Sequence, residues 1–255
     1  MLVLAVESAT EAAAVALADE EGVLGSLTVA GGRRHTESIA PAIEALCRRL
    51  GVVLADVDVV GIDVGPGLFT GLRVGVGTAQ ALAFALEIPV VTASSLEVLA
   101  HAVIVSGLAG GRLLVPVVDA RRAEVFSGRF RPSEESSSSE ESGWSAETPV
   151  AQYPEAVAAP ADLAAELATM GERMVLLGNG ALRYRPLFAD IAGATVAGPA
   201  YASPPVAALA DLCLIRARAG HTTDGAAVMP RYLRPADARI NWEQRIPARP
   251  ARAGS

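Results

Sequence analysis

The chain has 255 residues, a formal charge of −7 and no lysine, so all 21 of its basic residues are arginine. Without lysine it cannot carry a P-loop lysine, a Schiff-base lysine or the base of a Ser-x-x-Lys site. The negative charge also argues against independent binding of RNA or DNA, because such affinity comes mostly from cations that neutralise phosphates. At this length the chain can form one large domain or two of about 100 to 150 residues.

Hydrophobic residues make up 51% of the sequence and aromatic residues only 4%, so Ala, Val and Leu must build the core. No apolar run approaches the roughly 18 to 20 residues of a membrane-spanning helix, and the first residues lack the basic region of a signal peptide. Cys47 and Cys213 lie far apart and in no CxxC pair, which is typical of a reducing compartment. We therefore expect a soluble, cytoplasmic protein with no membrane contact.

Three strands and a helix are expected first. An apolar run at 2–8 indicates a buried strand, and 13–19 and 22–30 form a hairpin around a turn-like EEG. Apolar residues spaced by four, three and four predict an amphipathic helix over 35–51. Pro41 either occupies the first turn of this helix or kinks a helix that began near Thr36.

A second group of elements completes the first half. A buried strand is predicted at 57–63, followed by a Gly-Pro-Gly loop and a helix that has Thr70 as its N-cap and continues to residue 87. A short strand at 89–93 and a helix at 94–105 precede the Gly-rich GLAGG, which we expect to close the first domain.

The second half begins in the same style. The predicted elements are strands at 113–120, 123–130 and 173–179 and helices at 160–170 and 203–220. A Ser/Glu-rich insert at 131–143 has no apolar residue and is expected to be a solvated loop, and the Arg/Pro-rich tail at 245–255 is expected to be frayed. Two successive α/β units that each start with a strand and a hairpin predict tandem RNase H-like domains at 1–106 and 107–255.

Two short stretches offer weak signals for ligand binding. Glu7 and Thr10 lie in the turn after the first strand, where actin-like and sugar-kinase-like folds place groups for Mg²⁺-phosphate, although polar turns after strands are common. The stretch GPGLFTGLR fails as a P-loop in both its spacing and its cation. Arg73 in the first turn of the following helix opposes the helix dipole, so we expect it to pair with an acid or an anion, more often an internal carboxylate.

Small residues recur every four positions in the helix predicted after the GPG loop. One row consists of Gly71, Gly75, Ala79 and Ala83, and a neighbouring row of Gly77, Ala81 and Ala85. Glycine inside a helix costs roughly 1 kcal/mol relative to alanine. This cost is tolerated where a smooth face lets another backbone approach closely. The sequence leaves open whether that neighbour is the chain's own sheet or a partner, and one row is expected on each side.

No metal or nucleophile constellation stands out. The three histidines are scattered, with no HxxxH, HExxH or GxSxG motif. Asp119 and Glu124 flank Arg121 and Arg122 on a predicted hairpin, which indicates a salt-bridged turn more often than an acid-base pair.

Several motifs together resemble the TsaB (YeaZ) family. They are VLAVESATEAAAVAL, RHTESIAPAIEAL, GPGLFTGLRVGVGTAQALAFALEIPVV, SSLEVLA, VVDARRAEVF, GNGA and PRYLRPADA, in the family's order. They cover residues 1–130 densely and the remainder sparsely, and the GPG segment is the most specific of them. The Ser/Glu insert lies outside the family pattern, and Glu7 replaces the aspartate that is commonest in TsaB sequences.

The resemblance implies an actin-like ATPase (ASKHA) scaffold that is related to the catalytic subunit TsaD and has lost its activity, a pseudoenzyme. A TsaB protein binds TsaD and, with TsaE, supports transfer of threonylcarbamoyl from threonylcarbamoyl-AMP to N6 of adenosine 37 in ANN-reading tRNAs. ATP, Mg²⁺ and a transition metal would belong to the partner subunits, no cofactor to this chain alone, and tRNA would be met only through the complex. Ser95 and Leu99 hold the places of the His-x3-His pair of TsaD-like relatives, and leucine cannot ligate a metal.

The resemblance also implies where partners bind. The first two helices of the family, here 35–50 and 70–86, meet TsaD or a second TsaB chain. The interface residues expected on this basis are His35, Glu37, Ile39, Ile43, Gly71, Arg73, Gly75, Thr78, Ala79 and Leu82. Two other hypotheses remain: a nucleotide-dependent phosphotransferase or ATPase of the actin/sugar-kinase superfamily, and a metallopeptidase, which the missing metal ligands disfavour.

Overall fold

Each half of the chain folds around a five-stranded mixed sheet. The computed structural model describes residues 1–30, 35–133 and 147–234. The first sheet has the order β3-β2-β1-β4-β5, and its central strand β1 pairs antiparallel with β2 and parallel with β4. Its strands are β1 (Val3–Glu7), β2 (Ala13–Asp19), β3 (Gly22–Val29), β4 (Val59–Asp63) and β5 (Val90–Ala93).

The second sheet repeats the first, strand for strand. Its order is β10-β9-β6-β7-β8, and β6 pairs antiparallel with β7 and parallel with β9, as β1 does with β2 and β4. Its strands are β6 (Leu113–Arg121), β7 (Glu124–Pro132), β8 (Pro149–Ala158), β9 (Met174–Leu177) and β10 (Ala194–Val196). This duplication confirms the predicted α/β fold of two tandem RNase H-like, actin-like units.

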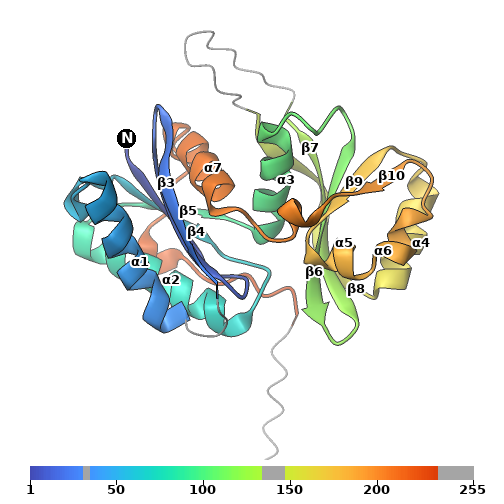
Figure 1. Cartoon of the computed structure of the whole chain (residues 1–255), viewed down its shortest axis with the longest axis horizontal. Helices are drawn as coiled ribbons and strands as arrows, with labels where there is room; N and C mark the ends of the chain where they lie inside the picture. Colours follow the sequence, from blue (N-terminus) through green and yellow to red (C-terminus); the bar gives the residue numbers. More distant parts are fainter. Residues whose placement is uncertain (31–34, 134–146, 235–255) are drawn as a thin grey trace, which may run out of the picture.

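Helices cover both faces of each sheet (Figure 1). One face of the first sheet carries α1 (His35–Leu50) and α2 (Phe69–Leu86), whose apolar residues share a core with the strands. The helix α3 (Ser95–Val105) lies between the two sheets, where Leu96 and Leu99 pack with Phe126 and Phe130. The outer face of the second sheet carries α4 (Pro160–Met170), α5 (Asn179–Arg183) and α6 (Arg185–Ala189).

The last long helix returns to the first sheet. Helix α7 (Val206–Arg218) follows β10 in the chain, yet it packs on β1 and β2. Leu209, Leu212 and Cys213 are fully buried there, in one apolar cluster with Val3 and Ala5. The core of the first half therefore includes residues from the second half of the sequence. The domain boundary after residue 106 stays a prediction.

Some local predictions differ from the structure. Helix α2 begins at Phe69 with Leu68 as its N-cap and no side-chain cap, so Thr70 is not the cap. Pro41 lies inside α1, which begins at His35, so the helix starts near Thr36 as in the second alternative; the kink at Pro41 stays a prediction. Strand β7 continues to Pro132, into the stretch expected to be a loop; residues 134–146 and the tail at 245–255 lie outside the described residues.

Helix α2 corrects one expectation about membranes. By length and composition alone, its 18 residues are long and apolar enough to cross a membrane. Buried core helices of other folded proteins also pass this test, and here one row of α2 packs against the sheet. Among the described residues no other helix meets the criterion.

Candidate functional site

The two rows of small residues on α2 face opposite ways. The row packed on the sheet consists of Gly71, Gly75, Ala79 and Ala83. A Cβ on Gly75 would collide with the hydroxyl of Ser8, which donates to the backbone oxygen of Gly71 at 2.9 Å. Nothing lies within 4 Å of a Cβ built on Gly77. Small residues on the inner row therefore let the helix approach β1 and β4 closely.

Half of the residues predicted to meet a partner, on α1 and α2, are buried within this chain, and their role in an interface stays a prediction. They are Ile39, Ile43, Gly71, Gly75 and Ala79, which pack against the chain's own sheet and helices.

The other predicted interface residues lie nearer the surface. Glu37 and Arg73 are exposed, and Thr78 and Leu82 are partly buried. His35 begins α1, and its side chain lies outside what the structure describes.

The exposed side of α2 is apolar, and the name "outer face" is used below for Gly77, Ala81, Phe84 and Ala85. All four residues are exposed; Ala81 lies four residues after Gly77, and Phe84 and Ala85 lie three and four residues after Ala81, so they share one side of the helix. The side chain of Phe84 is 87% exposed, the largest exposure among the large hydrophobic residues that the structure describes. The ring of Phe84 therefore projects into solvent from a helix surface made of small residues.

Arg73 meets an aromatic pair and a hydroxyl instead of the expected carboxylate. Its guanidinium lies 3.9 Å from the ring centre of Phe69, and its Nε donates to the hydroxyl of Tyr232 at 3.2 Å. The rings of Phe69 and Tyr232 are 5.2 Å apart. The helix dipole disfavours a cation in the first turn of α2, and the cation–π contact with Phe69 stabilises the guanidinium of Arg73 there.

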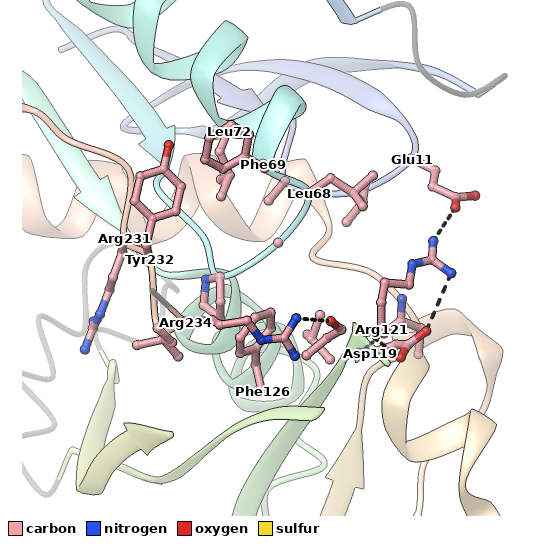
Figure 2. A pocket seen from close by; sticks show the side chains of 18 of the residues that line it. Glu11, Leu68, Phe69, Leu72, Asp119, Arg121, Phe126, Arg231, Tyr232 and Arg234 are labelled. Carbon is pink, nitrogen blue, oxygen red and sulfur yellow. Dashed lines mark hydrogen bonds and ion pairs between the residues drawn. The ribbon is translucent and has the colours of Figure 1, made fainter. Parts of the chain in front are cut away.

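A cavity of about 590 Å³ lies between the two halves (Figure 2). Its walls come from the β1–β2 turn at 9–11, the GPG loop and first turn of α2, the end of β6 with the residue after it at 118–122, and residues 231–234. The apolar lining includes Leu68, Leu72 and Phe126. A cavity of this volume can hold a drug-sized ligand.

Ion pairs occupy much of the polar rim of this cavity. Arg121 bridges the two halves, because its guanidinium lies 2.7 Å from Glu11 Oε1 and 3.6 Å from Asp119 Oδ2. Arg183 also contacts Asp119, and Arg234 contacts Glu124. These contacts make the β6–β7 hairpin a salt-bridged turn, as the sequence indicated.

Glu7 and Thr10 lie together, but only Thr10 lines the cavity. The carboxylate of Glu7 is buried and accepts hydrogen bonds from the backbone N–H of Ala9 at 2.8 Å and from Thr10 Oγ1 at 3.1 Å. These bonds stabilise the β1–β2 turn. A nucleotide role for Glu7 stays untested, and its carboxylate is already engaged by its own turn.

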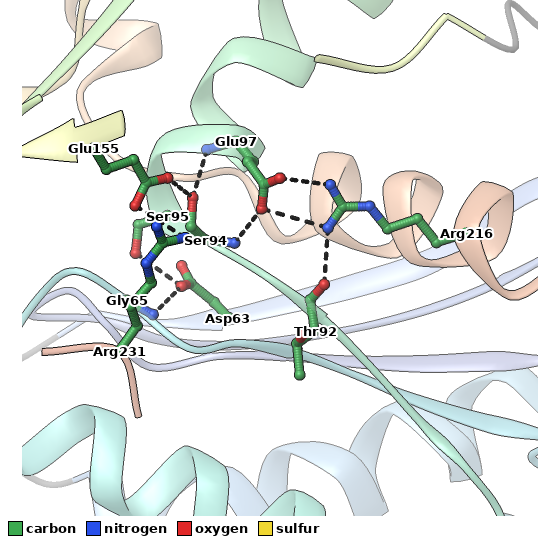
Figure 3. Close-up of polar contacts among 9 residues, drawn as sticks. All are labelled: Asp63, Gly65, Thr92, Ser94, Ser95, Glu97, Glu155, Arg216 and Arg231. Atoms are coloured by element: carbon green, nitrogen blue, oxygen red, sulfur yellow. Dashed lines mark hydrogen bonds and ion pairs between the residues drawn. The ribbon is translucent and has the colours of Figure 1, made fainter. Parts of the chain in front are cut away.

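A buried acidic cluster lies behind the GPG loop (Figure 3). Asp63, at the end of β4, accepts hydrogen bonds on Oδ1 from the N–H of Gly65 at 2.7 Å and from the hydroxyl of Ser95 at 2.8 Å. Glu155 reaches from β8 of the second sheet to the hydroxyl of Ser94 at 2.5 Å, and Arg231 lies 3.3 Å from its other oxygen. The cluster therefore joins both halves and the last described segment.

Burial disfavours the charged form of these acids. It raises the pKa of Asp63 to about 7, although the hydrogen bonds from Gly65 and Ser95 lower it. Burial raises the pKa of Glu7 well above its ordinary value, and the charge of Asp63 raises it further. Burial also raises the pKa of Glu155, against the lowering effect of Ser94 and Arg231. The sequence analysis did not identify Asp63 or Glu155 as site residues. Asp63 could have been found, because it is an acidic residue at the end of a buried parallel strand.

The places of the metal-binding pair of TsaD-like relatives are used for packing. Ser95 bonds to Asp63, and Leu99 is fully buried between the sheets. His101 points instead to Asp211 of α7, with 2.5 Å between Nε2 and Oδ2, so it is a buried, paired residue. Within the described ranges, no group of three or more His, Cys, Asp or Glu residues is arranged to hold a metal ion.

Comparison with known proteins places the chain in a family. Residues 23–242 match the family model described as TsaD: tRNA N6-adenosine threonylcarbamoyltransferase. The tRNA threonylcarbamoyladenosine biosynthesis protein TsaB of Escherichia coli is 33% identical over 52% of this chain and 57% of its own length. The TsaB protein of Haemophilus influenzae is 37% identical over 49% of this chain and 52% of its own length. A solved structure, YeaZ from Pseudomonas aeruginosa, is 27% identical with a TM-score of 0.72, over 91% of this chain and 99% of that one.

The chain belongs to the TsaB (YeaZ) family. The resemblance noted from the motifs is thereby confirmed. The sequence match spans little more than half the length of the curated TsaB relatives, whereas the structural match to YeaZ extends over both sheets. The duplicated fold of the family is therefore present in both halves, including the half where the motifs are sparse.

Proposed function

We propose that this TsaB family member is a non-catalytic docking subunit of the system that makes threonylcarbamoyladenosine in tRNA. It binds TsaD and, together with TsaE, supports transfer of threonylcarbamoyl to N6 of adenosine 37 in ANN-reading tRNAs. ATP, Mg²⁺ and a transition metal are then held by the partner subunits, and tRNA is met through the complex. The names of the curated relatives and of the matching family model support this biosynthetic role.

The outer face of α2 is the observation that supports docking. Phe84 is 87% exposed and lies among small residues that leave the helix surface flat around it. A flat helix surface with one protruding ring fits a packed helical interface, in which an aromatic residue fills a pocket of the partner. A standard interface needs about 800 Å² on each side, within reach of α1 and α2 together.

Phe84→Glu tests this proposal at the level of binding. We expect tagged Phe84→Glu protein to retain TsaD at least about tenfold less than the unchanged chain, which corresponds to about 1.4 kcal/mol. Leu187→Glu is the matched control, because Leu187 is also an exposed apolar residue, 42% exposed, but lies on α6 of the other half. Equal retention of TsaD by both variants would show that the outer face is not part of the interface. If this chain forms dimers by itself and Phe84→Glu disrupts them, the outer face belongs to a homodimer interface instead.

Depletion of the protein in its host tests the biological role. We expect threonylcarbamoyladenosine in bulk tRNA, measured by mass spectrometry, to fall on depletion. Expression of the unchanged chain or of Leu187→Glu should restore it, and expression of Phe84→Glu should not. Normal levels of the modified nucleoside after full depletion would contradict the proposed function.

A further inference from the structure

The segment from Val228 to Arg234, named the crossing segment below, contacts both halves of the molecule. We infer that the crossing segment ties the two halves together and holds the cleft between them at one fixed width. The tie acts in the free protein, before any partner binds.

One end of the crossing segment is fastened to the first half. The side-chain amide of Gln80 donates to the backbone oxygen of Val228 at 3.0 Å, which binds the segment to α2. The backbone N–H of Arg231 donates to the oxygen of Val64 at 2.8 Å, next to the GPG loop. Tyr232 then joins the cluster with Phe69 and Arg73 described above. The segment thus follows α2 back toward its first turn.

The following residues are fastened to the second half. The side chain of Leu233 packs against the apolar cluster between the sheets, which contains Phe126 and Phe130. Arg234 donates from Nη1 to the backbone oxygen of Ala120 at 3.2 Å, and its Nη2 contacts the carboxylate of Glu124. Figure 2 shows Tyr232 beside Phe69 and Arg234 lying toward the second sheet, on one wall of the cavity.

The spacing of these contacts makes the segment a short tie. Tyr232 is bound to α2 and Leu233 to the second half, and consecutive Cα atoms are only about 3.8 Å apart. Opening of the cleft by more than a few ångströms would therefore break the contacts on one side. Proteins that close around ligands by hinge motion need the opposite arrangement, with a few free hinge residues and lips that separate. The chain also passes between the sheets after α3 and before α7, so the crossing segment is a third connection between them.

Distance measurements between spin labels test the tie. The labels are placed on cysteines introduced as Arg49→Cys on α1 and Asp190→Cys at the end of α6, two exposed positions in different halves. Cys47 and Cys213 are buried, and a sample without the introduced cysteines measures any labelling of them. We expect one narrow distance distribution for the full chain. In the variant Tyr232→Ala, Leu233→Ser, Arg234→Ala the distribution should broaden roughly twofold, as for halves that move about the remaining connections.

Two controls make the result specific. Met229→Ala changes a 70% exposed residue of the same segment, and Arg218→Ala removes an exposed arginine at the end of α7; both should keep the narrow distribution. If the triple variant does not fold, as judged by circular dichroism, Arg234→Ala alone is measured, and faster amide exchange at residues 118–122 is the expected readout. A broad distribution in the unchanged chain, or unchanged widths and exchange in the variants, would overturn the inference.

Discussion

Gly75 and Gly77 lie two residues apart on α2, and their surroundings are opposite. Gly75 faces Ser8 and Ile62, whereas Gly77 faces open space. Gly75→Ala should lower the free energy of unfolding by about 1–3 kcal/mol, because the added methyl overpacks a buried contact. Gly77→Ala should raise it by up to about 1 kcal/mol through helix propensity alone. Urea denaturation of both variants measures the difference, and equal effects would contradict the assignment of the two rows.

The buried carboxyl of Asp63 makes stability depend on pH. In the unfolded chain Asp63 ionises near its ordinary pKa of about 4, whereas burial raises the pKa in the folded chain to about 7. The folded state therefore binds more protons within this window. The contribution of Asp63 to the free energy of unfolding is therefore greatest below pH 4. This contribution falls as the pH rises toward 7, by at most about 1.4 kcal/mol per pH unit.

Asp63→Asn should remove this pH dependence, because an amide does not ionise. The amide oxygen of the variant can still accept the hydrogen bonds from Gly65 and Ser95. The variant should gain stability relative to the unchanged chain as the pH rises from 5 to 7. Urea midpoints at pH 5, 6 and 7 measure this gain. If the urea midpoints of the two proteins change with pH by the same amount, Asp63 has the same pKa in the folded and unfolded chain, which would contradict this prediction.

Side-chain roles were the least predictable from the sequence. The pattern of small residues on α2 gave both rows correctly, but the row that meets the sheet depends on contacts with Ser8 and Ile62, which are distant in sequence. The same reason applies to Arg73, since its partner Tyr232 comes from the far end of the described chain. Local spacing cannot specify such long-range contacts.

At the scale of elements, a buried polar pair connects α3 to α7. His101 and Asp211 are enclosed between these helices, and Nε2 and Oδ2 lie 2.5 Å apart. Asp211→Leu leaves the imidazole without this partner and should cost about 1–3 kcal/mol of stability. The double variant His101→Leu, Asp211→Leu should lose less than the sum of the two single variants. A double-mutant cycle by urea denaturation checks this, and simple additivity would contradict a coupled pair.

Elements with a clear hydrophobic pattern were predicted well. The strands and helices of the first half follow continuous apolar runs or helical spacing, and the structure has them within a few residues. Strand β8 was missed because it is the edge of its sheet, mostly exposed and interrupted by Pro154, so its sequence has no alternation. Strand β10 and the helices α5 and α6 are only 3 to 5 residues long, too short to show a period.

At the scale of the whole molecule, α7 makes the first half dependent on the second. A fragment of residues 1–106, the predicted first domain, lacks Leu209, Leu212 and Cys213 against one face of its sheet. We expect this fragment to show no cooperative thermal transition by circular dichroism. A fusion of the fragment to residues 203–234 through a flexible linker should restore one. A sharp transition in the fragment alone would show that the first half folds independently.

The late position of α7 also affects the protein while it is being synthesised. At about 5–20 residues per second, the ribosome needs roughly 6–23 s to extend the nascent chain from the end of α3 to the end of α7. During this interval the sheet surface later covered by α7 is open, and the apolar helix α2 has already emerged. Chaperones that bind exposed hydrophobic segments near the ribosome are therefore expected to bind the nascent chain during this interval.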